Sequence, residues 1–263
     1  MNRFNFMNRK FIILCLTFLC ASFMVKAETY RFDIGQFEKI KVNGNFRVIY
    51  KNLPDSSGYA YYSAPAGHHN IFNITVKNDG TLVTELMSDR WGQEDLPVLH
   101  LYSDFLSSLE SQSNQTINIK SLAPCASFTV KQIGNGTITV DGLKCNKVDA
   151  SINTGNGTII LSGQCINANY QMIGAGMISA DQLVAENVKC RILGTGNIGC
   201  WAVDNLNVSG IGTTKIYYKG SPNIKKTGGG KLIELPEEDQ RHKGVAVPSF
   251  DEDYYKTEVS EDD

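Results

Sequence analysis

The sequence predicts an all-β protein: a parallel β-helix, a solenoid with coils of about 20 residues, preceded by a β-rich N-terminal capping region. Two observations carry this prediction. Between residues 133 and 212 a Gly-x-Gly motif recurs with a regular period, and its first glycines are Gly134, Gly155, Gly174, Gly194 and Gly210. Apolar residues alternate with polar ones on both sides of each motif, which is the period of a strand and not of a helix. A repeat of this length cannot bury its apolar face alone, so successive repeats are expected to stack.

Each Gly-x-Gly motif predicts a corner between two short strands, because glycine tolerates a positive φ where the chain turns. The motif does not fit a phosphate-binding loop, since no helix follows it. It also lacks the recurring aspartate of calcium-binding β-helix repeats. We therefore interpret ten glycines as a structural repeat: Gly134, Gly136, Gly155, Gly157, Gly174, Gly176, Gly194, Gly196, Gly210 and Gly212.

The apolar residues after each motif are expected to stack into inward-facing columns. The position two residues after the second glycine gives Ile138, Ile159, Ile178, Ile198 and Thr214, and the position four residues after it gives Val140, Leu161, Ala180, Cys200 and Ile216. A further apolar column, Cys125, Cys145, Cys165 and Ala185, suggests a third wall in each coil. The ladder is expected to begin near residue 113, because Ile117 and Ile119 fall in the same columns.

Residues 1–27 predict a secretory signal. Basic residues precede an apolar run over residues 11–25, and Val25-Lys26-Ala27 fits the small-residue rule for cleavage. The mature chain should begin at Glu28. No later apolar run approaches the length needed to cross a bilayer, so we expect an exported protein with no transmembrane segment after signal cleavage.

Residues 28–112 do not share the period of the repeat and predict longer strands. Ile40, Val42 and Phe46 belong to an alternating run, and Lys77-Asn78-Asp79-Gly80 is a hairpin signal. We interpret this part as a cap, because an open end of a solenoid presents unpaired strand edges. Residues 28–235 are then one continuous domain, with coils over residues 113–235.

Charge separates the chain into two parts. Without the four basic residues of the expected signal, the formal charge of −2 becomes −6 for the rest of the chain. From Glu234 onward, eleven acidic residues against three basic ones give −8, which leaves the folded body near +2. A near-neutral body argues against a nucleic-acid partner. Residues 236–263 are expected to form an acidic, disordered tail that solvates the protein or contacts a partner.

The segments 37–44, 74–82 and 98–102, together with the repeated Gly-x-Gly-x-Ile, resemble a known family. This is the putative auto-transporter adhesin family, the head GIN domain, found in secreted and envelope proteins of Bacteroidetes. The resemblance covers most of the mature chain. It implies a right-handed β-helix and a role at the cell surface, and it implies no catalytic residues.

Five cysteines remain after the expected signal, and three of them recur with the period of the coils. Stacked Cys125, Cys145 and Cys165 would lie about 4.8 Å apart, within reach of a disulfide but with awkward torsions. Two interpretations stay open: a ladder of buried thiols, or a bridge joining Cys145 to Cys125 or to Cys165. No Cys-x-x-Cys or nearby histidine completes a zinc site, so neither a metal nor another cofactor is expected.

Catalytic groups are scattered. Asp141, Asp149 and Asp181 show no paired carboxylates of the kind that glycoside hydrolysis needs, and no histidine lies beside a plausible nucleophile. Aromatic residues are the better candidates for ligand binding, because their flat faces suit sugar rings and protein partners. The candidates are Tyr59, Tyr61, Tyr62, Trp91, Tyr217 and Tyr218, unless these rings only fill the core.

These observations favour an exported, non-enzymatic protein of the bacterial cell envelope, located in the periplasm, on the outer-membrane surface or outside the cell. Its β-helix surface would act as an adhesin or scaffold, with a surface glycan or an envelope protein as the partner. The alternatives are a carbohydrate-active β-helix enzyme and an envelope assembly or stress-sensing component.

Overall fold

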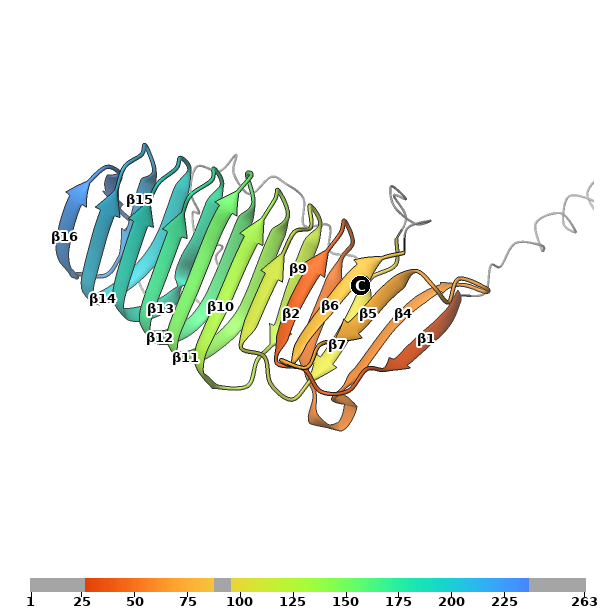
Figure 1. Ribbon diagram of the computed structural model, residues 1–263. Coiled ribbons are helices and arrows are strands. Elements are labelled where there is room, and N and C mark those ends of the chain that lie inside the picture. Colours follow the sequence, from red (N-terminus) through yellow and green to blue (C-terminus); the bar gives the residue numbers. More distant parts are fainter. Residues whose placement is uncertain (1–26, 88–95, 237–263) are drawn as a thin grey trace, which may run out of the picture.

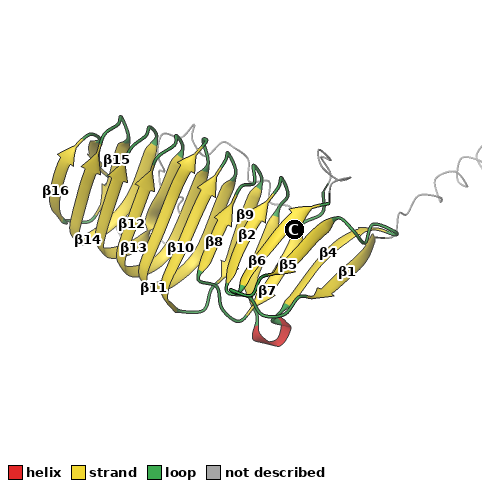
Figure 2. Ribbon diagram, viewed as in Figure 1, coloured by secondary structure: helices red, strands yellow, loops and turns green. Residues whose placement is uncertain are grey.

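The computed structural model describes residues 27–87 and 96–236, and in these ranges the chain forms a β-solenoid of about six turns (Figure 1). Strands account for 68% of the structure. Helical structure in the described ranges is limited to the short 3₁₀ turn η1, Pro54–Ser56 (Figure 2). The predicted all-β solenoid is therefore confirmed. No helix in these ranges is both long and apolar enough to cross a membrane.

The seventeen strands of the described residues belong to one hydrogen-bonded sheet. Those of the first half are β1 (Ala27–Asp33), β2 (Lys39–Asn43), β3 (Val48–Asn52), β4 (Tyr59–Pro65), β5 (Phe72–Val76), β6 (Thr81–Leu86), β7 (Leu99–Ser103), β8 (Ser108–Ser111) and β9 (Thr116–Ser121). The second half contains β10 (Cys125–Ile133), β11 (Thr137–Thr154), β12 (Thr158–Met172), β13 (Met177–Ile192), β14 (Asn197–Gly210), β15 (Lys215–Lys219), β16 (Asn223–Gly228) and β17 (Lys231–Glu234).

Each regular coil has three walls. In β11 they are residues 137–140, 143–145 and 147–152, and each pairs in parallel with its equivalent in β12. We call them the first, second and third walls in that order. The second wall carries the cysteine column, since Cys145 pairs with Cys125 on one side and with Cys165 on the other. The wall inferred from the cysteine spacing is therefore present.

The isoleucine column of the first wall is confirmed, with one correction at its far end. Ile138, Ile159, Ile178 and Ile198 are fully buried and in register. The next member is Ile216 and not Thr214. Strand β15 begins two residues later after its glycines than the preceding strands do, so counting from the motif gives the wrong register. Thr214 is buried in the turn instead, where its Oγ1 donates a hydrogen bond to the Gly194 carbonyl (3.3 Å).

Close backbone packing, and not only a positive φ, explains the repeat glycines. Six of the ten have a positive φ, but Gly136, Gly157, Gly174 and Gly194 do not. A Cβ atom added at Gly174 would lie 2.8 Å from the carbonyl oxygen of Gly155 on the neighbouring rung. The rungs therefore approach too closely at these corners for any side chain.

An asparagine ladder runs beside the same corners. The backbone N–H of Asn114 donates to Asn45 Oδ1 (3.0 Å), and that of Asn135 donates to Asn114 Oδ1 (3.1 Å). The N–H of Asn156 then donates to Asn135 Oδ1 (2.9 Å). Three such bonds, each through one asparagine side chain, thus link four rungs outside the regular strand pairing.

The N-terminal region enters the ladder out of chain order. Strand β2 pairs in parallel with both β6 and β8, and β3 pairs in parallel with both β7 and β9. The rung formed by β2 and β3 therefore lies between rungs that follow it in the sequence (Figure 1). Among the described strands, only β1 with β4, β4 with β7, and β5 with β6 are antiparallel. The expected N-terminal cap thus contains solenoid rungs as well as antiparallel strands.

Candidate binding surface

The outer face of β4 and β7 gathers aromatic side chains. Alternation along β4 turns Tyr59 and Tyr61 outward, while the residues between and after them are buried. Antiparallel pairing sets Tyr59 opposite Tyr102 and Tyr61 opposite His100. Strand β1 adds Arg31, which is paired with Tyr61. We call these five residues the tyrosine–histidine patch.

Three rings of this patch, those of Tyr61, His100 and Tyr102, lie nearly parallel to one another. The Tyr61 and His100 ring centroids are 4.4 Å apart with an interplanar angle of 3°, and the Tyr61 and Tyr102 rings are 5.8 Å apart at 13°. The guanidinium carbon of Arg31 lies 3.8 Å from the centre of the Tyr59 ring. The hydroxyl of Tyr102 donates to that of Tyr61 at 3.4 Å. Packing of this kind fixes flat surfaces before any ligand arrives.

The patch is largely neutral near pH 7. Burial, helped by the charge of Lys51, lowers the pKa of His100, so its imidazole is uncharged. Burial and the neighbouring Tyr61 raise the pKa of Tyr102, which therefore keeps its proton. The Nδ1 atom of His100 has no hydrogen-bond partner among the described residues. Arg31 is the cation of the patch, and Lys51 of the neighbouring strand β3 is in register with Tyr102.

One residue predicted to join this surface, Tyr62, lies in the core instead. Tyr62 has no exposed area, its ring packs against Phe72 with centroids 5.1 Å apart, and its hydroxyl donates to the His68 carbonyl (3.0 Å). It is a core residue because it occupies the opposite face of β4 from Tyr61. Trp91, also a predicted candidate, lies outside the described residues.

Tyr217 of β15 lies on the same side of the rod as Tyr61 but far from it. A continuous register column runs from Tyr61 through Asn118 and Ile160 to Tyr217, in eight strand steps. At about 4.8 Å per step, Tyr61 and Tyr217 are roughly 38 Å apart. Tyr218 packs partly against the core and its hydroxyl donates to Glu234 (3.3 Å). The predicted tyrosines therefore form two separate sets.

An uncharged strip lies between these sets on the outer face of the first wall. Its members share half-buried side chains at outward-facing positions of β9, β11 and β12. They are Thr116, Asn118, Thr137, Thr139, Thr158 and Ile160. Equivalent side chains of the strip repeat at the strand spacing of about 4.8 Å.

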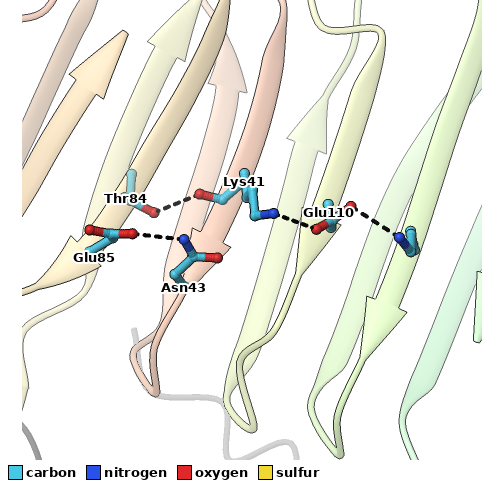
Figure 3. Close-up of polar contacts among 6 residues, drawn as sticks. Lys41, Asn43, Thr84, Glu85 and Glu110 are labelled. Carbon is cyan, nitrogen blue, oxygen red and sulfur yellow. Dashed lines mark hydrogen bonds and ion pairs between the residues drawn. The ribbon is translucent and has the colours of Figure 1, made fainter. Parts of the chain in front are cut away.

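The third wall carries charges that are already paired. The carboxylate of Glu110 lies between two lysines, 2.9 Å from Lys41 Nζ and 3.2 Å from Lys131 Nζ. Figure 3 shows Lys41 and Glu110 facing each other across neighbouring strands, with Asn43 donating to Glu85 beside them (2.8 Å). Partial burial opposes ionisation of Glu110, but the two lysines hold its pKa below the usual value.

The aspartates considered for catalysis do not converge. Asp149 is 2.7 Å from Lys147 Nζ and accepts a hydrogen bond from Asn169 (2.7 Å). Asp181 faces Lys219 at 3.5 Å, and Asp141 is exposed in the bend after the first wall. Within residues 27–87 and 96–236, no group of three or more potential ligands is arranged to hold a metal ion.

Sequence reasoning missed Arg31, His100 and Tyr102. The alternation in Leu-His-Leu-Tyr-Ser places His100 and Tyr102 on one face of a strand. What the sequence did not reveal is that this strand pairs with β4, although β5 and β6 lie between them in the chain. The rings could therefore not be joined to Tyr59 and Tyr61.

Comparison with known families gives one match. The family model described as "Putative auto-transporter adhesin, head GIN domain" matches residues 36–222, which is most of the chain. Among curated proteins, none matches the chain.

Solved structures share the fold at low sequence identity. A crystal structure of a "putative adhesin" from Bacteroides fragilis has a TM-score of 0.70 and 24% identity, covering 80% of this chain and 97% of that chain. A "putative adhesin" from Parabacteroides merdae has a TM-score of 0.65 and 22% identity, with coverage of 80% and 97%. A "Putative lipid binding protein" from Parabacteroides distasonis has a TM-score of 0.61 and 19% identity, again covering 80% and 97%. At these identities the likeness concerns the fold alone.

Proposed function

The chain belongs to the putative auto-transporter adhesin family, the head GIN domain, and on this premise we propose that it is an exported bacterial envelope protein that binds a surface glycan without cleaving it. The tyrosine–histidine patch is the proposed contact site. The observation that best supports this site is the near-parallel packing of the Tyr61 ring on His100 and beside Tyr102.

The chemistry of the patch suits a sugar ring. Aromatic faces offer apolar area to the C–H face of a pyranose, and the hydroxyl groups of Tyr59 and Tyr61 and the guanidinium of Arg31 offer hydrogen bonds to its edge. The neutral state of His100 avoids a desolvation cost when a neutral glycan covers the ring. A strongly cationic ligand is disfavoured, because Arg31 lies over the Tyr59 ring.

The rest of the first wall suits a polymer more than a single sugar. Strand β3 lies between the patch and the uncharged strip and adds Ile49 and the exposed Lys51 to this face. Beyond β3 the strip follows the register column that contains Asn118 and Ile160. Backbone ladders hold its threonines at fixed intervals, so binding requires little ordering of the protein. We propose that a glycan chain lies along this strip with one end on the patch.

Binding is tested with a glycan array on the full-length protein, followed by calorimetry on the best ligand. Tyr61→Ala should weaken binding at least about 10-fold, since aromatic contacts dominate such interfaces. Tyr217→Ala is the matched control on the same face, and its affinity should equal that of the wild type. If Tyr61→Ala binds as tightly as the wild type, the patch is not the site. Release of reducing ends from the bound glycan would instead support the enzymatic alternative.

We also propose that residues 1–27 are removed on export and that residues 236–263 extend from the domain as an acidic tail. The basic and apolar composition of the first segment supports cleavage before Glu28. N-terminal sequencing of the protein recovered from the envelope should begin at Glu28, and recovery of an intact N-terminus would contradict export by this route. Pull-down with and without residues 237–263 tests the tail: loss of an envelope protein would favour the scaffold alternative.

A further inference from the structure

Three cysteines lie in register on the second wall. Cys125, Cys145 and Cys165 belong to three successive rungs, and the parallel register pairs each with the next. The Sγ atoms of Cys125 and Cys145 are 2.8 Å apart. Non-bonded carbon atoms already prefer separations of about 3.5–4.0 Å, and sulfur is larger, so these two thiols are closer than ordinary packing requires.

Cys125 stands at an open edge. The second-wall part of β10 pairs only with β11, because β8 reaches β10 only at residues 129–132 on the third wall. No earlier rung supplies a strand that covers Cys125 on its other side in the described ranges. An edge segment of this kind is held by one set of hydrogen bonds and opens more readily than an interior strand.

The three thiols differ in access. They line a surface depression of about 700 Å³ together with Lys144, Glu186 and other residues of the second wall. Cys125 is half-buried, whereas Cys145 and Cys165 are each only 8% exposed. Burial, together with the contact to Cys125, raises the pKa of Cys145 to about 12. Cys125 is therefore the thiol that a reagent reaches first.

We propose that Cys125 and Cys145 form a disulfide that fastens the open edge of the second wall to the next rung, and that Cys165 stays a free thiol. The proposal rests on the export proposed above in one respect: a disulfide persists only in an oxidising compartment, and export would place the protein in one. The pairing itself follows from the register and the distance between the two sulfur atoms.

The oxidant is a donor disulfide, either oxidised glutathione or a protein disulfide. The Cys125 thiolate attacks one donor sulfur, which gives a mixed disulfide and releases one donor thiol. The Cys145 thiolate then attacks the Cys125 sulfur and displaces the second donor thiol. The two cysteines together lose two electrons and two protons, and the donor disulfide gains them as two thiols.

The bridge closes a loop of about 20 residues that spans one coil, so it should limit opening of the edge. The test uses the full chain treated with oxidised glutathione and compared with the same chain after reduction. Oxidation should remove two titratable thiols, and peptide mapping under non-reducing conditions should join Cys125 to Cys145. The melting temperature should rise by about 5 °C or more, and amide exchange over residues 126–128 should slow.

Two variants control the assignment. Cys165→Ser should keep the bridge and the higher melting temperature, whereas Cys125→Ser should lose both and fold with the same circular dichroism spectrum as the reduced protein. A bridge joining Cys145 to Cys165, a stable glutathione adduct on Cys125, or alkylation of both Cys125 and Cys145 after oxidation would each overturn the pairing. Protein recovered from the envelope should carry the bridge. If it is reduced there while the purified chain bridges in vitro, the pairing stands but export to an oxidising compartment does not.

Discussion

Gly194→Ala tests the close approach of backbones at the rung corners. An alanine Cβ there would overlap the carbonyl oxygen of Gly174, although Gly194 itself has no positive φ. We expect a loss of about 3 kcal/mol in the free energy of unfolding, because neighbouring backbone cannot move aside as a side chain can. The measurement is urea denaturation followed by circular dichroism.

Gly142 provides the matched control. It has a φ of 69°, but a Cβ added there would meet nothing within 4 Å. Gly142→Ala should therefore cost only the left-handed backbone strain, about 1 kcal/mol. Equal losses for the two variants would mean that turn geometry, and not rung spacing, selects glycine at the corners.

Glu110 predicts a dependence of stability on pH. Its pKa in the folded protein is lowered by Lys41 and Lys131, so its contribution is complete above the pKa of an unfolded glutamate, about 4.3, and is lost as the pH falls through the folded value. Glu110→Gln should cost about 1 kcal/mol or less at pH 7, since the group is partly exposed. Between pH 5 and pH 3 the wild type should lose this advantage. Denaturation midpoints that stay equally separated at both pH values would contradict it.

At the scale of elements, the asparagine ladder joins rungs through their corners. Asn135→Ala removes the acceptor of the Asn156 N–H. We expect amide exchange at Asn156 to quicken by about 3- to 10-fold and stability to fall by about 1 kcal/mol. Thr195→Ala, at a corner that the ladder does not reach, should leave the exchange at Asn156 unchanged. Unaltered amide exchange at Asn156 in the Asn135→Ala variant would show that a water molecule replaces the lost acceptor without any loss of stability.

Local repetition explains which elements the sequence predicts. The column from Ile138 to Ile198 follows from alternation and a fixed period, because each strand lies beside its sequence neighbour. Prediction fails where the spacing after the motif changes or where a strand is mistaken for a loop. Counting from the motif assigns Thr214 to the column that Ile216 occupies, since β15 begins late after its glycines. Local clustering assigns Tyr62 to a binding loop, but it lies on the buried face of a strand.

The same reasoning explains what the sequence reveals of the candidate site. Tyr59 and Tyr61 could be identified from composition and local clustering. Their packing partners His100 and Tyr102 could not, because they come from β7, which is not the sequence neighbour of β4. A surface made by distant antiparallel strands leaves no periodic trace in the sequence.

For the whole molecule, the position of β2 and β3 predicts how the rod tolerates truncation. A chain lacking residues 27–53 loses an interior rung, so β6 and β8 would face an empty position. We expect that chain to fail to fold as a monomer. A chain ending at residue 213 loses only the rungs at the far end and should fold with a melting temperature lower by several degrees.

For both truncated chains, circular dichroism measures the melting transition and size-exclusion chromatography measures the oligomeric state. A monomeric, cooperatively melting chain without residues 27–53 would show that the flanking rungs can close together. Failure of the shorter C-terminal truncation would show that stability is not shared between neighbouring rungs alone.

The rung formed by β2 and β3 lies inside the rod, and this position also determines when the rod can be completed. Synthesis delivers β2 and β3 early, yet β9, which covers one side of β3, ends only at Ser121. The intervening chain of about 70 residues takes roughly 3–14 s to make at translation rates of about 5–20 residues per second, and the earliest rung keeps open edges for that time. Folding of this rung is therefore complete only after strands much later in the chain have been made.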